Sequence, residues 1–435
     1  WKNAAPMDGS IFYNVYTDAN DFFSMGVDGS MNFEVVNKAG GSYNMELKLN
    51  KQFRDPSAWY HICVLIDTTQ STNTNRVKIY VNGVQETSFA TSTYPDQNTD
   101  LHMNSNSETA RISPSQNRIH GYLAEFVAID GTVKVVTDFG EFDEDSPTIW
   151  KPIDVSGLSG DKGTNGFYLD FEDSSALGNC AFGGTDFTVS NLAATDQTTD
   201  SPTNSFCTFN SLAPSAAALA AHANGFGEGN RQNGEQSPNN WQSLPSTFGV
   251  TSGKWYWEFK DENSWGTTSN STRRYGICDL DTILHTESSS TDVKFSDTTS
   301  AYAYMNASGV RYNNGTISGT TSDHPTFTDD DIIMVALDLT NNKLYFGKNG
   351  TWNDSGDPTS GSTGTGSVAD ISATATWSPY VETQYGSDNV SANFGNPIAA
   401  PSSGNADGNG YGNFEYAPPS GYLALCTKNL GSDGG

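Results

Sequence analysis

The nearest approach to a catalytic pair in this sequence is the acidic stretch Glu141-Phe142-Asp143-Glu144-Asp145. Two carboxylates held about 5 Å apart can cleave a glycosidic bond, because one attacks the sugar and the other donates a proton. Side chains two positions apart share one face of a strand, so Glu141 and Asp143 can converge. A catalytic strand of this kind also needs a second glutamate, but the residue at its position is Ser146. Pro147 follows directly and would disturb an interior strand. We therefore expect a solvated acidic turn and no catalytic residue.

The histidines form no metal-binding or catalytic pattern, because none is part of an HExxH motif or has paired spacing. His61 alternates with Trp59 and Cys63 and is predicted to lie in or near a core. The glycine-rich stretch 361–366 is followed by no Lys-Ser or Lys-Thr pair, so we expect it to be a loop that does not bind phosphate. The six histidines are His61, His102, His120, His222, His285 and His324.

Three acidic turns offer hard oxygen ligands of the kind that Ca²⁺ prefers. They span residues 18–21, 279–281 and 329–331, and no EF-hand loop is present. Acidic turns are also commonly just solvated. Ca²⁺ is therefore a possible cofactor, none is required, and no ligand position can be named.

Two tryptophans in polar loops are the candidates for ligand binding, because a flat ring can stack on the face of a sugar. They are Trp265, within Asn263-Ser264-Trp265-Gly266-Thr267, and Trp352, within Gly350-Thr351-Trp352-Asn353-Asp354. The alternative is that either ring folds inward and closes the end of a core.

The charge balance excludes one class of partner. The 435 residues include 22 Lys and Arg against 50 Asp and Glu, a net charge of −28 that opposes binding to nucleic acid. No run approaches the roughly 20 apolar residues that span a bilayer, so no membrane insertion is expected. A hydrophobic content of 35% with 43 glycines fits β domains with polar loops. Because the chain opens at Trp1 without a signal-like segment, we expect it to be part of a longer protein.

The cysteines are too far apart for CxxC metal ligation. Cys63 lies in an apolar run and is predicted to be buried. Cys180 with Cys207 is the only plausible disulfide. An odd count of five, with at least one thiol unpaired, suits folding in a reducing cytoplasm.

Short alternating runs separated by turn residues predict strands nearly throughout. The Asn-Gly pairs at 82–83, 314–315 and 349–350 predict tight hairpins, because Asn and Gly tolerate positive φ. Two blocks repeat one order of elements, a buried strand, an Asp-Thr turn or its equivalent, an alternating strand and an Asn-Gly turn, at residues 64–83 and 335–350. The alanine-rich stretch 211–223 predicts the one helix.

This pattern predicts two antiparallel β-sandwiches joined by an irregular linker. The first comprises residues 1–190, with its N-terminal strands expected to be missing. Residues 191–240 form the linker with the short helix, because 191–205 contains almost no residue able to anchor a core. Residues 241–400 form the second sandwich, and 401–435 are expected to begin a further segment.

Three groups of motifs carry family resemblances. Residues 59–67, 77–83 and 121–126 resemble a laminin-G or concanavalin A-like lectin/glucanase sandwich, over roughly residues 1–171. Five motifs in order resemble a SPRY domain, at 253–258, 275–278, 329–350, 377–380 and 392–395. The segments 139–145, 150–152, 163–171 and 186–192 resemble virion proteins of tailed phages, especially marine ones.

The resemblances imply a fibre or surface protein on the phage virion, made in the bacterial host cytoplasm. Its sandwich loops would bind a glycan or protein of the host surface, and it would contact other virion proteins as a homo-oligomer, by analogy a trimer. The alternative is a purely structural capsid or tail decoration protein without host contact. A glycan-degrading enzyme is the third hypothesis. Because we expect no catalytic residue, we expect no enzymatic activity.

Overall fold

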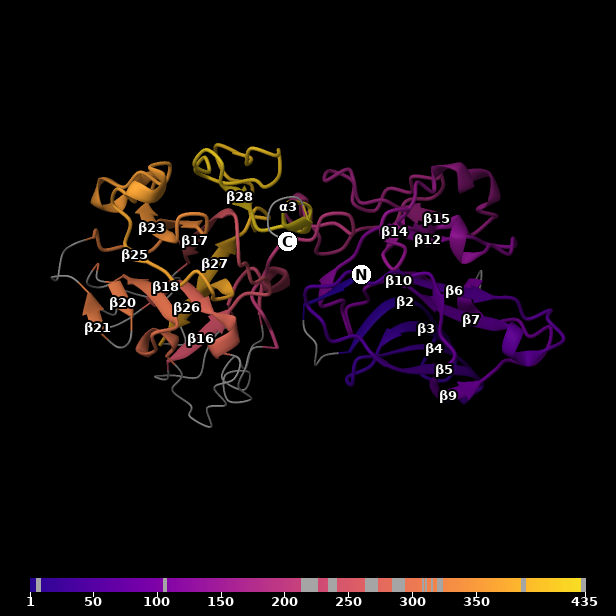
Figure 1. The fold of residues 1–435 in the computed structure, drawn as a ribbon. Coiled ribbons are helices and arrows are strands. Elements are labelled where there is room, and N and C mark those ends of the chain that lie inside the picture. The colour runs from indigo at the N-terminus through magenta and orange to yellow at the C-terminus, as the bar shows by residue number, and fades with distance from the viewer. Residues whose placement is uncertain are drawn as a thin grey trace. The chain divides into compact units, whose positions relative to one another are not determined.

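The computed structural model describes residues 1–4, 9–104, 108–212, 226–233, 241–262, 273–283, 294–306, 309, 311–313, 316–318, 324–384 and 389–431. The chain forms two compact units. One comprises Trp1–Gln197 with Ser201–Thr203, and the other Thr198–Asp200 with Asn204–Gly435. The regular secondary structure of both consists almost entirely of strands, and these pair antiparallel except β28 with β17 (Figure 1). The predicted all-β class with two sandwiches is confirmed.

The main sheet of the first unit has six strands that lie side by side (Figure 1). One face is fully buried and includes Phe23, Val35 and Leu47, as expected when every second side chain points inward. The spatial order is β10 (Ala110–Ile112), β2 (Ser10–Tyr16), β3 (Phe22–Val27), β4 (Asn32–Ala39), β5 (Ser42–Gln52) and β9 (Phe89–Thr93).

The N-terminal part of the chain supplies most of this sheet, and the expectation that further N-terminal strands are missing stays a prediction. β2 to β5 precede Trp59 and are four of its six strands. Register shifts occur between Ile11 and Tyr13 and between Asn37 and Lys38. Because each extra residue breaks the two-residue alternation, these strands lack a simple sequence pattern.

Shorter strands complete the first unit. The inner side chains of β7 and β15 share one core cluster with the main sheet. These strands are β6 (Ile62–Ile66), β7 (Val77–Val81) and β8 (Val84–Gln85), then β12 (Phe126–Ala128) paired with β15 (Phe167–Leu169), β1 (Lys2–Asn3) with β11 (Gly121–Tyr122), and β13 (Gly140–Phe142) with β14 (Trp150–Pro152).

Trp150 anchors the β13–β14 ribbon. Its ring lies on Gly83 and Gly140, where an added Cβ would meet ring atoms at 2.1 and 2.5 Å. Its ring centroid lies 5.7 Å from that of His61. Glycine is therefore required at both positions for the indole to lie flat against the β7–β8 turn.

The second unit contains two large sheets. One has the order β16 (Gln242–Pro245), β26 (Trp377–Thr383), β18 (Arg273–Asp279), β19 (Ala301–Met305), β20 (Arg311–Asn313) and β21 (Thr316–Ser318). The other has β24 (Thr351–Trp352), β23 (Lys343–Lys348), β22 (Ile332–Asp338), β17 (Lys254–Asp261) and β27 (Val390–Asn393), with β25 (Ala369–Asp370) on β23 and β28 (Leu423–Ala424) on β17.

A core of aromatic and branched residues packs between these sheets. Trp255, Trp257 and Phe259 alternate along β17 toward it and are fully buried. Phe209 belongs to the same cluster and stacks on Phe259 at 6.4 Å. Residues 206–209 thus belong to the second unit, although the sequence analysis placed them in a linker.

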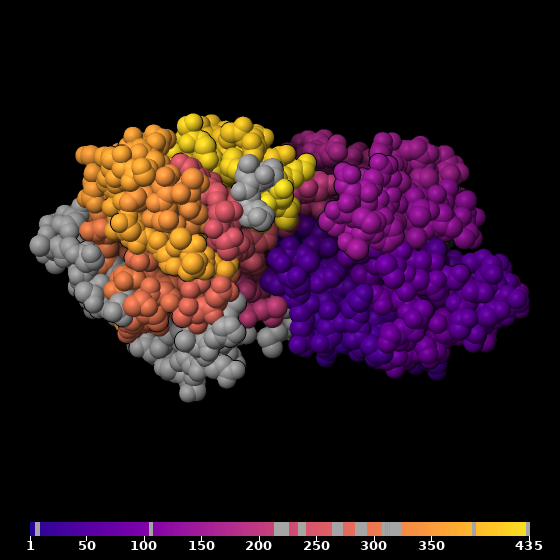
Figure 2. Space-filling view, in the orientation of Figure 1, coloured from indigo at the N-terminus to yellow at the C-terminus, as the bar shows by residue number. Residues whose placement is uncertain are grey.

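The C-terminal residues also belong to the second unit, so the expectation that 401–435 begin a further segment is wrong. β28 pairs with β17, and Tyr422 and Phe414 are fully buried. Glu258 holds this segment, because its carboxylate accepts the backbone amides of Glu415 (3.0 Å) and Tyr416 (2.8 Å). Figure 2 shows these yellow residues packed beside the orange part of the same unit.

Two of the three predicted Asn-Gly hairpins are confirmed. Asn82 and Gly83 have φ of 48° and 75°, and Asn349 and Gly350 have 47° and 82°, as a type I′ turn requires. The first connects β7 to β8 and the second β23 to β24. The pair at 314–315 lies outside the described residues.

The predicted Cys180–Cys207 disulfide is not formed. All five cysteines carry buried thiols. Cys180 belongs to the core cluster of the first unit and Cys207 to that of the second. Each sulfur is therefore used as a small apolar group in its own core.

The helices of the described residues are short. The predicted helix at 211–223 lies almost entirely outside them. No helix in the described part of the chain is long and apolar enough to span a membrane. The helices are α2 (Leu280–Ile283), α3 (Thr427–Asn429) and the 3₁₀ turns Asn73–Asn75, His102–Asn104, Val136–Asp138, Ser156–Asp161, Ala194–Asp196, Glu228–Asn230, Phe295–Asp297, Asn353–Ser355 and Gly361–Thr363.

We expect Glu258→Ala to destabilise the second unit by about 3 kcal/mol, because two partly buried backbone amides and the buried Tyr256 hydroxyl lose their acceptor. Denaturant unfolding followed by tryptophan fluorescence measures this loss. The control is Glu262→Ala, which removes a partly exposed ion pair with Lys260 and should cost less than about 1 kcal/mol. Equal losses in the two variants would show that Glu258 does not hold the C-terminal segment.

Candidate functional site

The two tryptophans proposed for ligand binding have different outcomes. Trp265 lies outside the described residues. Trp352 is half-buried, packs against the cluster that contains Met334 and Phe414, and lies edge-on to Tyr256 at 6.4 Å. One side of the Trp352 ring is thus covered by the core, and its role in ligand binding stays a prediction.

The acidic stretch around Glu141 is the solvent-exposed end of β13 followed by a turn that begins at Asp143. Lys151 lies 3.3 Å from Glu141 and 3.5 Å from Asp143 on the neighbouring strand. The carboxylate of Asp143 accepts the amides of Asp145 and Ser146, both at 3.0 Å, and these hydrogen bonds lower its pKa. Lys151 thus lies near both carboxylates, and the amides of the turn also hydrogen-bond to that of Asp143.

The acidic turns named as candidate Ca²⁺ sites use their carboxylates to close turns. Asp18 accepts the amide of Asn20 at 2.7 Å, and Asp279 accepts that of Asp281 at 3.2 Å. Asp331 pairs with Lys348 at 2.8 Å. Within the described ranges, no group of three or more acidic, histidine or cysteine side chains could hold a metal.

A row of aromatic side chains crosses the outer face of the main sheet in the first unit. It consists of Tyr16 on β2, Phe22 on β3, Lys38 on β4 and Tyr43 on β5, which are successive partners in the strand register. We call these four residues the aromatic row. Tyr16 is 42% exposed and Tyr43 49%. Phe22 between them is partly exposed, and the strands that carry the four residues lie next to one another in the sheet (Figure 1).

The rings of the aromatic row contact one another directly. The centroid of Phe22 lies 6.0 Å from that of Tyr16, at an interplanar angle of 31°, and 6.3 Å from that of Tyr43, at 88°. The ammonium of Lys38 lies 5.4 Å from the Tyr43 ring and 6.0 Å from the Phe22 ring. This cation–π contact keeps the row ordered without burying it.

Polar groups border the aromatic row at the β2–β3 turn. Lys38 donates to the carbonyl of Ala19 at 2.9 Å. Asp21 accepts the amide of Gly40 at 2.8 Å and lies 3.7 Å from Nε2 of His102. A flat ring next to charged donors and acceptors can bind a sugar, because the ring covers the apolar face while polar groups bond the hydroxyls.

The sequence analysis missed the aromatic row. Tyr16, Phe22 and Tyr43 are far enough apart that no local motif joins them. The bulge between Asn37 and Lys38 moves Tyr43 to the outer face, although Met45 two residues later points inward. The sequence does place these three aromatic residues beside two short turns. Grouping them into one row, however, requires knowledge of the strand register.

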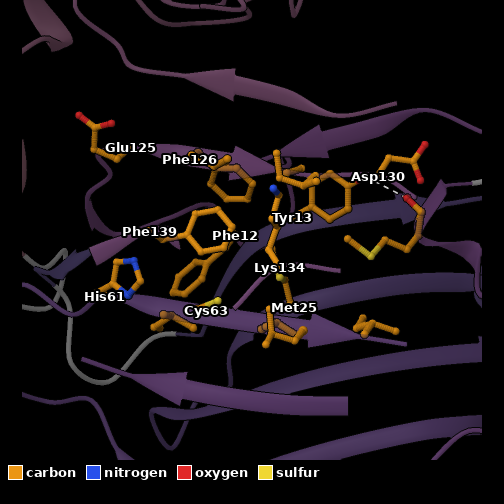
Figure 3. A pocket seen from close by; sticks show the side chains of 18 of the residues that line it. Phe12, Tyr13, Met25, His61, Cys63, Glu125, Phe126, Asp130, Lys134 and Phe139 are labelled. Atoms are coloured by element: carbon orange, nitrogen blue, oxygen red, sulfur yellow. Dashed lines mark hydrogen bonds between the residues drawn. The ribbon is translucent and has the colours of Figure 1, made fainter. Parts of the chain in front are cut away.

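A cavity of about 960 Å³ lies within the first unit, between the main sheet and strands β6 and β12 (Figure 3). Phe12 and Tyr13 project into it from β2, Cys63 from β6 and Phe126 from β12. Burial together with the charge of Asp138 raises the pKa of the Cys63 thiol to about 12, so the thiol stays protonated. The lining combines apolar side chains with polar ones such as His61, Glu125 and Lys134.

A few buried polar groups also line this cavity. Nδ1 of His61 and the indole nitrogens of Trp1 and Trp150 are buried and have no hydrogen-bond partner among the described residues. Burial, together with the charge of the Trp1 amino group, lowers the pKa of His61 to about 4. As predicted, His61 lies at the edge of a core, and it is neutral at pH 7.

Comparisons with known proteins agree with these two folds. Residues 2–133 match the family model described as the concanavalin A-like lectin/glucanases superfamily, and residues 254–366 match the SPRY domain model. The chain contains a concanavalin A-like domain followed by a SPRY domain. Among solved structures, it is similar to the SPRY domain of human HERC1, with 21% identity over 37% of this chain and 85% of that chain and a TM-score of 0.28. No curated protein matches it.

We expect His61 to destabilise the concanavalin A-like domain in acid. Its pKa is about 4 in the folded domain against 6.5 normally, so the unfolded chain binds the extra proton first and stability falls as the pH drops from 6.5 to 4. The loss reaches about 3 kcal/mol at most. Unfolding free energies at pH 7 and pH 4 should differ less for His61→Gln than for the parent chain. An unchanged difference in that variant would contradict the shift.

Proposed function

We propose that this chain is a non-catalytic binding protein whose concanavalin A-like domain recognises a surface glycan through the aromatic row. The observation that carries the proposal is the set of three rings in strand register, with Tyr16 and Tyr43 exposed, Phe22 partly exposed and Lys38 next to Phe22 and Tyr43. Large exposed aromatics cost solubility and are uncommon in such groups without a partner. The lectin-like family match supports the same class of ligand.

The polar border supports a glycan over an apolar peptide. Lys38 within the row and the neighbouring Asp21 and His102 offer polar groups to which sugar hydroxyls can donate or from which they can accept. The net charge of −28 disfavours acidic polymers such as nucleic acid. We therefore propose that the ligand is a neutral or amine-bearing glycan.

We further propose that the protein is displayed on a phage virion, as a fibre or surface appendage that contacts the host. Support for this step is the sequence resemblance of residues 139–192 to tailed-phage virion proteins. A homo-oligomer, host-surface partners and contacts with other virion proteins belong to the same proposal. The alternative is a decoration protein that docks only to other virion proteins, and an exposed aromatic row would serve it as a docking surface.

We expect the full chain to bind specific glycans on an array, and Tyr16→Ala and Tyr43→Ala each to weaken that binding about five- to tenfold, because each ring contact contributes about 1 kcal/mol. Both residues are solvent-facing, so the unfolding free energy should change by less than about 0.5 kcal/mol. The matched control is Tyr80→Ala on β7, whose hydroxyl lies 3.3 Å from Gln85. It should leave binding unchanged.

The other outcomes assign function elsewhere. Binding that is lost on replacing Trp265 or Trp352 would locate recognition in the SPRY domain. Binding only in the presence of Ca²⁺ would add a metal to the site. No binding to any glycan or host cell would favour the decoration role, and glycan cleavage that is lost in a double alanine variant of Glu141 and Asp143 would favour an enzyme.

A further inference from the structure

The cavity of the concanavalin A-like domain has aromatic walls. The rings of Phe12 and Tyr13 project into it from β2 and that of Phe126 from β12, and Phe139 and Trp150 also line it (Figure 3). Its volume of about 960 Å³ suits a small organic molecule, since sites for such ligands usually measure about 300–1,000 Å³. The faces of aromatic rings are electron-rich, so walls of this kind attract cations as well as apolar groups.

The charged side chains that line the cavity are mostly acidic. Among the described lining residues, Lys134 is the one lysine or arginine, and its ammonium is already paired with Asp161 at 2.6 Å. The cavity therefore has a negative potential that favours a cation and repels an anion. The carboxylates of the lining are Asp67, Asp100, Glu125 and Asp130.

Glu125 is the carboxylate best placed to hold a cation. It lines the cavity and remains accessible to solvent, so it lies where the cavity opens. The Tyr168 hydroxyl donates a hydrogen bond to it, and no basic side chain of the described residues forms an ion pair with it. Partial burial, together with the charges of Asp170, Glu172 and Asp154, raises the pKa of the Glu125 carboxyl. A cation at this opening would relieve the repulsion.

These groups fit an organic cation better than a metal ion. Within the described ranges, no three acidic, histidine or cysteine side chains lie close enough together to hold a metal. An organic ammonium needs no such shell of ligands, because one carboxylate can pair with its charge while aromatic rings contact its alkyl groups. The rings begin directly beside the carboxylate, at Phe126 (Figure 3).

We propose that the cavity binds an organic ammonium ion with an apolar body, whose charged group lies at Glu125 and whose apolar part lies between the rings of β2 and β12. This inference is independent of the proposed glycan binding. The aromatic row lies on the outer face of the main sheet, whereas Tyr13, Phe23 and Phe33 on the inner face line the cavity.

The test titrates the full chain, by calorimetry, with ligands that share an octyl chain and differ in charge. We expect octyltrimethylammonium to bind at one site per chain with a Kd at least about tenfold lower than that of octyl sulfate, and 1-octanol to lie between them. Tetramethylammonium carries the charge without the apolar body. It should bind at least about tenfold more weakly than octyltrimethylammonium.

Two variants locate the ligand. Glu125→Gln keeps an acceptor for the Tyr168 hydroxyl but removes the charge, so it should weaken octyltrimethylammonium about fivefold and leave 1-octanol unchanged. The matched control is Glu144→Gln, an exposed acid outside the cavity lining, which should change neither affinity. Cys63 projects into the cavity, so Cys63→Phe fills it and should abolish binding of every octyl ligand.

Hydrogen exchange of the parent chain locates the ligand without any variant. Bound octyltrimethylammonium should slow amide exchange in β6 and in residues 126–129, all of which line the cavity. Exchange in residues 16–22, beside the aromatic row, should stay unchanged. Slowing confined to residues 16–22 would place the ligand on the outer face and contradict the proposal.

The remaining outcomes overturn the proposal. Equal affinity for the three octyl ligands would mean an apolar cavity without preference for charge, and no binding would mean that the cavity takes no such ligand. Cation binding that persists in both Glu125→Gln and Cys63→Phe would reflect the net charge of −28 alone. Tyr16→Ala is titrated in parallel and should bind octyltrimethylammonium normally, so this proposal and glycan binding by the aromatic row fail separately.

Discussion

The structure depends on the pairing of backbone groups along strand edges. A buried N–H or C=O group without a partner costs about 1–3 kcal/mol, so a strand inside a sandwich needs a neighbour on each side. In the SPRY domain β17 has β22 on one side and β27 and β28 on the other. The C-terminal residues are therefore needed to finish a sheet that begins about 170 positions earlier in the chain. In the concanavalin A-like domain β1 pairs with β11 on one side, and on the other Trp1 exchanges two hydrogen bonds with Tyr60.

Buried carboxylates connect loops to strands in the SPRY domain, whereas the concanavalin A-like domain relies more on apolar contacts. Glu382 accepts the hydroxyl of Ser243 and the amide of Ser296, both at 2.9 Å, and pairs with Arg274 at 2.8 Å. Asp407 accepts the amide of Ala424 at 2.9 Å. Each such group fixes segments that are distant in sequence, because a carboxylate has several acceptor positions. Much of the acidic composition of this domain is therefore structural.

The parts of the fold that local sequence determines could be predicted, and the parts that depend on register could not. Asn82-Gly83 and Asn349-Gly350 specify their own turns through positive φ, and the runs beside them alternate in the manner of strands. The aromatic row depends on how Phe22 and Lys38 align across two strands with bulges, which no short window contains. Likewise, the exposure of Glu141 and the turn at Asp143 follow from the local sequence, whereas nothing around Tyr422 indicates that it packs in a core far upstream.

The five buried thiols have a consequence for where this fold can persist. Neither domain depends on a covalent cross-link, since every cysteine serves as a small apolar side chain. The burial that excludes water from Cys63 and Cys278 also raises the pKa of each thiol, so little reactive thiolate forms at neutral pH. The fold of each domain therefore does not depend on the redox potential of its surroundings. A chain built in this way can move from a reducing to an oxidising medium without changing its bonding.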